Sequence, residues 1–104
     1  LDVDDEAIDI IPVKNTLHQN YPNPFNPTTT IPFDIVNSDQ VNLNVYNIKG
    51  EMVRALVNSY LNPGSYEVRW NGKSDSGVNL SAGMYFIELK GTNFRETNKM
   101  IYLK

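Results

Sequence analysis

The sequence VNLNVY, residues 41–46, alternates apolar and polar side chains more clearly than any other stretch of the chain. A period of two places Val41, Leu43 and Val45 on one face and the asparagines on the other, which is typical of a strand with one buried face. The next residues, NIKGE at 47–51, are expected to form a tight turn in which Gly50 supplies a positive φ. The pattern therefore predicts an antiparallel strand that ends in a hairpin turn.

Similar strands are expected on both sides of this one. Residues 29–35, 65–70 and 85–90 alternate in the same way, residues 52–57 read as a returning strand with a bulge or a helix-like kink, and a last strand is expected over about 95–103. The connections are too short for parallel crossovers, which need a dozen or more residues. Short strands spaced near ten residues apart predict an all-β, antiparallel β-sandwich of about seven strands.

Composition agrees with this fold class. The chain has 104 residues, which fits one domain, and it contains six prolines, six glycines and fourteen asparagines. These residues are enriched in turns and depleted in helix interiors, so a helical bundle is excluded. No apolar run is long enough for a membrane-spanning helix.

The sequence LHQNYPNPFNPT, residues 17–28, carries three prolines. Proline fixes φ and lacks an N–H donor, so this stretch is predicted to be neither a helix nor a central strand. We expect a stiff, extended segment held down by Leu17, Tyr21 and Phe25.

Residues 1–16 read as a separate segment ahead of a domain at 17–104. Five of the twelve acidic residues lie within the first nine positions, and the apolar stretch AIDIIPV follows at 7–13. The segment is interpreted as a linker or an extra edge strand. The alternative is a donor strand, formed by Ile8, Ile10 and Val13, that pairs with another copy of the molecule.

Charge and cysteine content exclude several classes of function. The formal net charge is −3 and the sequence pI is about 4.9, so no nucleic-acid partner is expected. The absence of cysteine rules out disulfides and a cysteine nucleophile. The chain begins with Leu rather than Met, and we expect a processed product or a piece of a longer protein.

Candidate catalytic and metal-binding residues are few. His18 is the only histidine, and nothing in the sequence predicts that it is held against a nucleophile. Asn71, Ser74 and Asp75 could supply oxygen ligands for calcium, but the loop has only one carboxylate and an Asx-turn is the preferred interpretation. The sequence thus predicts no enzyme activity, no cofactor and no metal.

Two further groups of side chains receive a structural interpretation. Glu67 and Glu88 are each flanked by a base, Arg69 and Lys90, and are predicted to face solvent and to form cross-strand ion pairs rather than to cleave glycosides. The aromatic residues at 46, 60 and 86 could form a sugar-binding platform, although packing in the core or in an interface is the preferred interpretation.

Six motifs in order carry a family resemblance: NYPNPFNPTTTI (20–31), VYNIKG (45–50), PGSY (63–66), WNG (70–72) with Gly77, GMYF (83–86), and the ending at 97–104. Over residues 17–104 the chain resembles the C-terminal sorting domain of the type IX (Por) secretion system. It also resembles the related immunoglobulin-like domain of flagellar hook-capping proteins. The resemblance implies an immunoglobulin-like sandwich.

The same resemblance implies a non-enzymatic role in export. Such domains pass through the periplasm, are recognised by the outer-membrane secretion machinery, and place a protein at the surface of a Gram-negative-type bacterium, with cleavage or attachment to lipopolysaccharide. The final residues Lys99, Met100, Leu103 and Lys104 are the expected contacts with that machinery. The remaining family positions are expected to be structural: Pro22, Asn23, Pro24, Phe25, Gly50, Gly64, Tyr66, Trp70, Gly83 and Tyr85.

Two other functions stay open at this point. The first is an extracellular filament or surface-layer subunit, polymerised by the donor strand at 7–13. The second, with weaker support, is a carbohydrate-binding accessory module.

Overall fold

The computed structural model describes residues 12–104, which form seven strands and, within that range, no helix. The strands are β2 (Thr16–Leu17), β3 (Thr29–Ile35), β4 (Asp39–Tyr46), β5 (Met52–Leu61), β6 (Gly64–Trp70), β7 (Gly83–Lys90) and β8 (Arg95–Tyr102).

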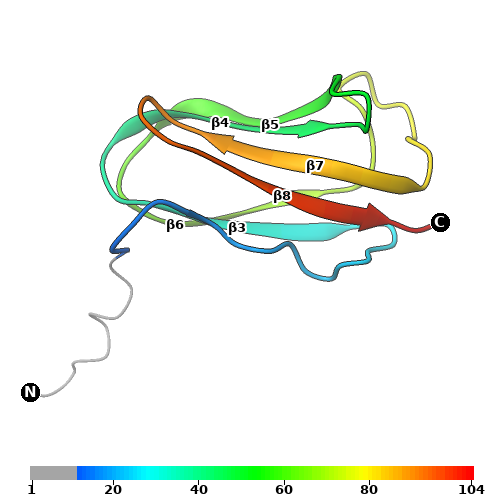
Figure 1. The fold of residues 1–104 in the computed structure, drawn as a ribbon, viewed down its shortest axis with the longest axis horizontal. Helices are drawn as coiled ribbons and strands as arrows, with labels where there is room; N and C mark the ends of the chain where they lie inside the picture. Colours follow the sequence, from blue (N-terminus) through cyan, green and yellow to red (C-terminus); the bar gives the residue numbers. More distant parts are fainter. Residues whose placement is uncertain (1–11) are drawn as a thin grey trace, which may run out of the picture.

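The strands form two antiparallel sheets that face each other (Figure 1). One sheet has the order β2-β3-β6, and the other has the order β5-β4-β7-β8. Every pairing between these strands is antiparallel. The predicted all-β, immunoglobulin-like sandwich of about seven strands is therefore confirmed.

The core lies between the sheets and is built by the period-two pattern. On β4, residues 41, 43 and 45 are fully buried, and on β7 the same holds for Ile87 and Leu89. Trp70 ends β6 with no exposed surface, and its indole N–H donates to the carbonyl oxygen of Lys73 at 2.9 Å. Burial on this scale at ~25 cal/mol per Å² of apolar area supplies most of the driving force for folding.

Strand β5 departs most from the simple alternating pattern. It runs to Leu61 rather than to residue 57, and its register against β4 shifts between Leu43 and Asn44 and again between Val45 and Tyr46. Each shift is a bulge or irregularity, which explains why the sequence pattern is ambiguous here. The bulge interpretation is confirmed and the helix-like alternative is wrong.

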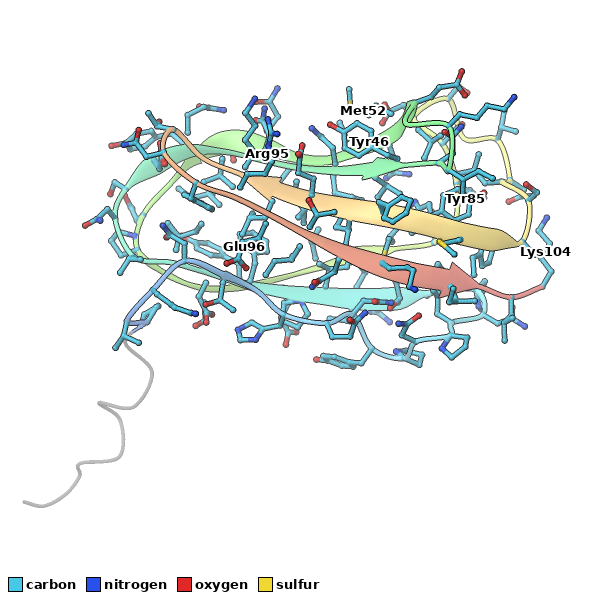
Figure 2. The ribbon with its side chains drawn as sticks, in the orientation of Figure 1. Tyr46, Met52, Tyr85, Arg95, Glu96 and Lys104 are labelled. Atoms are coloured by element: carbon cyan, nitrogen blue, oxygen red, sulfur yellow. The ribbon has the colours of Figure 1, made fainter. Side chains whose placement is uncertain are left out.

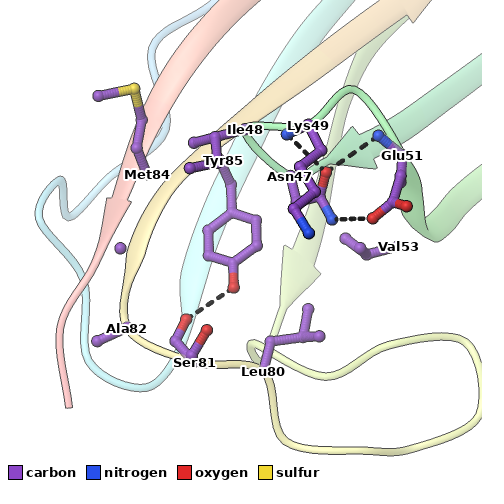
Figure 3. Close-up of a pocket in the computed structure, with 11 residues that line it drawn as sticks. Asn47, Ile48, Lys49, Glu51, Val53, Leu80, Ser81, Ala82, Met84 and Tyr85 are labelled. Atoms are coloured by element: carbon purple, nitrogen blue, oxygen red, sulfur yellow. Dashed lines mark hydrogen bonds between the residues drawn. The ribbon is translucent and has the colours of Figure 1, made fainter.

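The turn between β4 and β5 has the predicted geometry. Gly50 has a φ of 84°, and the side-chain oxygen of Asn47 accepts backbone N–H groups from Lys49 at 2.9 Å and Glu51 at 3.0 Å (Figure 3). The Asn47 amide also donates to the Glu51 carboxylate at 2.8 Å. The side chain of this one asparagine therefore stabilises the turn through three hydrogen bonds within it.

The proline-rich segment bends at residues 22–24 and 26–27, so the expected extended conformation is wrong, and only two of its three predicted anchors are buried. Leu17 is 6% exposed and Phe25 is 1% exposed, whereas Tyr21 is 53% exposed. The Tyr21 ring lies outside the core, and its hydroxyl donates to Glu67 at 3.1 Å. The expectation that Tyr21 packs onto the body is therefore wrong, because its backbone pairs with Thr30 and turns the ring toward solvent.

The predicted boundary between residues 16 and 17 falls within the short strand β2. Thr16 pairs with Asp34, and the Asn15 side chain accepts the backbone N–H of Val36 at 2.8 Å. Val13, the last residue of the predicted donor strand, is 90% exposed. Ile8 and Ile10 lie outside the described residues.

Candidate functional site

The last strand, β8, is the outer strand of its sheet, and the segment 17–25 lies along it. At one end, the backbone N–H of Leu17 donates to the Glu96 carboxylate at 2.8 Å. The Asn98 amide donates to the carbonyl oxygen of Leu17 at 3.1 Å. Polar side chains of β8 thus substitute for the backbone ladder that a regular neighbouring strand would supply.

The other end of β8 is held by backbone pairing. Phe25 donates its N–H to the Ile101 carbonyl and accepts the Leu103 N–H, both at 2.9 Å. The Ile101 N–H donates to the side-chain oxygen of Asn23 at 2.9 Å. Since an uncovered strand edge is a template for further pairing, these contacts remove that template from the end of β8.

Phe25 also fastens the segment to the core. Its ring stacks on Tyr102 with centroids 4.9 Å apart and planes 9° apart, and it lies 5.5 Å from the Trp70 ring. Tyr85 completes the cluster at 5.5 Å from Trp70 in an edge-on arrangement. Three family-motif residues, Phe25, Trp70 and Tyr85, therefore meet in one aromatic cluster with Tyr102.

Polar groups in the proline-rich segment form hydrogen bonds with one another and with Thr29. Asn20 is buried, and its amide donates to Thr29 Oγ1 at 2.9 Å and to the Pro22 carbonyl at 3.2 Å. The Thr29 hydroxyl donates to the same carbonyl at 2.9 Å. A buried polar group is costly without partners, so this small network stabilises a loop that has few backbone donors.

The four candidate recognition residues differ in exposure. Lys99, Leu103 and Lys104 are exposed, and Lys104 projects at the end of the chain (Figure 2). Met100 is fully buried in the core. The expectation that Met100 contacts a partner is therefore wrong for the folded domain, because its position alternates with Lys99 and Ile101 and faces inward. The Lys99 carbonyl accepts a hydrogen bond from Gln19 at 3.1 Å, so the backbone of this strand is fixed.

Two tyrosines of the family motifs hold turns. The Tyr85 hydroxyl donates to the Ser81 carbonyl at 2.7 Å (Figure 3), and the Tyr66 hydroxyl donates to the Asn62 carbonyl at 2.5 Å. In each case a half- or fully buried ring near the start of a strand reaches back four residues. These contacts tie the turns before Gly83 and Gly64 to the sandwich.

A hollow of about 270 Å³ lies between the β4–β5 turn and the start of β7 (Figure 3). Its titratable side chains are Lys49, Glu51 and Tyr85. Glu51 and Tyr85 are already committed to the hydrogen bonds described above. Within residues 12–104, no group of three or more acidic, histidine or cysteine side chains is placed to hold a metal ion.

The three aromatic residues considered for sugar binding do not form one platform. Tyr46 and Phe86 lie opposite each other on neighbouring strands, whereas Tyr60 pairs with Gln40 at the far end of β4. Six residues of strand correspond to about 20 Å. A platform of all three is therefore excluded, because the strand register separates them.

The loop at 71–77 is occupied by internal hydrogen bonds. Asn71 accepts the Lys73 N–H at 3.2 Å, as an Asx-turn requires. Asp75 accepts the Ala55 N–H at 3.0 Å and donates its own N–H to Val53 at 3.0 Å. The Asx-turn interpretation is confirmed, and the Asp75 carboxylate covers part of the β5 edge.

His18 has a partner that the sequence analysis missed. Its Nε2 lies 2.8 Å from the Asp34 carboxylate, which also accepts the Ser65 hydroxyl at 2.8 Å. In a catalytic triad the histidine stands between serine and aspartate and takes the serine proton. Here the aspartate stands in the middle, so the imidazole has no contact with the hydroxyl.

The predicted cross-strand ion pairing is confirmed for Glu88, whereas Glu67 forms a hydrogen bond with a tyrosine instead. Glu88 forms an ion pair with Arg95 on β8 at 3.0 Å rather than with Lys90, because Arg95 lies on the adjacent strand. Glu67 accepts the Tyr21 hydroxyl, and this carboxylate raises the pKa of Tyr21 above its ordinary value. Both glutamates therefore have structural partners.

The architecture defines an immunoglobulin-like β-sandwich, and the comparisons with known proteins agree. The chain belongs to the FlgD Ig-like domain family, which matches residues 28–94. No curated protein matches the chain. Among solved structures, the crystal structure of dimeric latent PorU from Porphyromonas gingivalis is similar with a TM-score of 0.67 and 20% identity. The match covers 88% of this chain and 10% of the PorU chain, and at this identity it shows the fold.

Proposed function

We propose that this domain is a non-enzymatic sorting and anchoring domain for type IX secretion, placed at the C-terminal end of an exported protein. The observation that carries the proposal is the structural likeness to PorU from Porphyromonas gingivalis, in which the matching domain corresponds to 10% of the chain. The six motifs of the sorting-domain resemblance support the same assignment. The partner would be the outer-membrane secretion machinery, and the destination would be the surface of a Gram-negative-type bacterium.

The geometry of β8 supports a recognition role for its end. The Asn23 side chain and the Phe25 backbone hold the strand up to Leu103, so the residues after this point are presented from a rigid base. Leu103 is 48% exposed, and Lys104 follows it in solvent. An exposed leucine next to a lysine offers one apolar and one cationic contact. Met100 would act indirectly, by anchoring the strand that carries them.

No helix in residues 12–104 is long and apolar enough to cross a membrane. The resemblance to sorting domains implies recognition by the outer-membrane secretion machinery, followed by cleavage or by attachment to surface lipopolysaccharide.

The test fuses the domain to a folded reporter in a bacterium that has type IX secretion. The variant Leu103→Ser/Lys104→Glu changes only exposed side chains, so the domain should fold while the reporter accumulates in the periplasm. Lys90→Glu, an exposed lysine at the far end of β7, is the matched control and should be secreted normally. Undiminished secretion of the Leu103→Ser/Lys104→Glu fusion would rule out the proposed contact.

A further inference from the structure

Strand β6 is the outer strand of the three-stranded sheet, and within residues 12–104 it pairs only with β3. Its other edge therefore carries backbone N–H and C=O groups with no strand beside them. Of the residues that the structure describes, those that bond to the outer edge of the facing strand β5 do so near residues 53–55, where Asp75 binds the backbone of Val53 and Ala55. The two sheets are thus open toward solvent along the rest of this side.

A groove of about 310 Å³ lies along this opening. Half-buried apolar side chains from both sheets line it, namely Leu56, Val57, Leu61, Tyr66 and Val68. Together with the free edge of β6, the groove offers what strand addition requires: backbone groups for a ladder and an apolar cleft for alternate side chains.

We propose that residues Ala7–Ile11 of a second copy of this chain add to β6 as an antiparallel strand, with Ile10 in this groove and Ile8 beside the Trp70 end of β6. The proposal is independent of the secretion role. In such a strand Asp9 faces outward, between the two isoleucines, because side chains alternate. The segment therefore carries an apolar face for the groove and a carboxylate for the solvent side.

The charges on β6 select a register. Glu67 and Arg69 both face solvent, so a carboxylate opposite Glu67 is repelled and one opposite Arg69 is attracted. Among the described residues, the side chain of Arg69 has neither a hydrogen-bond nor an ion-pair partner, while its backbone lies in the ladder with β3. Placing Asp9 beside Arg69 brings Ile10 beside Val68, at the groove, and Ile8 beside Trp70, at the end of β6.

The length of the connecting chain favours a second copy over the same copy. Asn15 is held at β2 by its bond to Val36, and β2 is on the opposite side of the sheet from the free edge of β6. The position outside β6 is three strand spacings away, about 14 Å. Four residues from Ile11 to Asn15 reach about 14 Å only when straight and fully extended. That leaves no length for the path around the end of the sheet.

The experiment measures the mass of the full chain by sedimentation velocity over a wide range of concentrations. The wild type should associate as its concentration rises. Ile8→Asp/Ile10→Asp should be monomeric, while the matched control Val3→Asp, which lies in the same segment but outside the added strand, should associate like the wild type. A wild type that stays monomeric at every concentration would overturn the proposal. This holds even if hydrogen exchange shows that the β6 edge of the monomer is protected, because the segment of the same copy would then cover it. An Ile8→Asp/Ile10→Asp variant that associates normally would overturn the proposal as well.

Charge reversal tests the register. Arg69→Glu should weaken association about fivefold, since it replaces a cross-strand attraction by a repulsion. Lys90→Glu on the other sheet should not weaken it. The combination Arg69→Glu with Asp9→Arg should restore association, because the pair is re-formed with its charges exchanged. A combination that is no better than Arg69→Glu alone would overturn the proposed pairing.

Discussion

Strands β8 and β6 are each the last strand of a sheet, but only β8 has its free edge covered by other described residues. The segment 17–25 covers β8 with backbone bonds at Phe25 and side-chain bonds elsewhere. No described residue covers β6, whose edge lies beside an apolar groove. A sandwich of this size can thus protect one edge with irregular chain and leave another free for pairing.

The protected edge depends most on Phe25. Phe25→Ala should lower the free energy of unfolding by roughly 3–5 kcal/mol, because it removes a fully buried ring that stacks on Tyr102. Chemical denaturation measures this loss. Tyr21→Ala is the matched control in the same segment and should cost about 0.5 kcal/mol or less, since that ring is largely exposed. Equal losses for the two variants would contradict the assignment of Phe25 as the anchor.

Gly72 packs closely against the ring of Tyr102 on β8, and a larger residue at this position should disturb that packing. Gly72 has a φ of +75°, and a Cβ atom there would lie 2.6 Å from Cζ of Tyr102. Gly77 has a similar φ of +85° but open space around it. Gly77→Ala should cost about 1 kcal/mol from backbone strain, and Gly72→Ala should cost about 1–3 kcal/mol more from the clash. Thermal unfolding of the two variants separates these effects, and equal losses would argue against tight packing on Tyr102.

A single hydrogen bond at the covered edge is tested by Asn23→Ala. The Ile101 N–H loses its acceptor, which should lower stability by about 1 kcal/mol and speed hydrogen exchange at Ile101. Asn26→Ala, an exposed asparagine in the same segment, should leave both quantities unchanged. Unchanged exchange at Ile101 in Asn23→Ala would show that the side chain does not hold the strand.

The smallest effect concerns the turn that leads into β8. Hydrogen bonds from the side chain and the backbone N–H of Thr92 hold the pKa of Asp39 below its ordinary value of 3.8. A lowered pKa in the folded state adds stability above the ordinary pKa, and this contribution disappears as the pH falls through the lowered value. The stability difference between wild type and Asp39→Asn should therefore shrink from about pH 6 to about pH 2. A pH-independent difference would contradict the ionic origin of this contact.

Much of the sandwich could be predicted from local pattern. Alternation at 41–46 and 85–90 places the right residues inside, since a strand with one buried face must repeat every two residues. The β5 bulges could be suspected but not located, because they depend on the register against β4. Met100 was predicted to contact a partner, but it is buried. Strand periodicity alone could have indicated this, because Lys99 and Ile101 on either side of it face outward.

The side-chain contacts of the candidate site were largely beyond sequence reasoning. Glu96 and Asn98 bind residues about eighty positions earlier in the chain, and nothing local marks them as partners of Leu17. The pairing of His18 with Asp34 likewise arises only because β3 runs beside the segment that carries His18.

The sequence by itself determined the fold class, the inward faces of the strands and the turn residues, because these follow from periodicity and from the backbone limits of proline and glycine. Only the tertiary structure decided which edges are covered. Coverage depends on contacts between residues far apart in the chain, and such contacts leave no periodic trace in the sequence. Within residues 12–104, the structure therefore shows the proline-rich motif bonded to the last strand and the outer edge of β6 without a neighbouring strand.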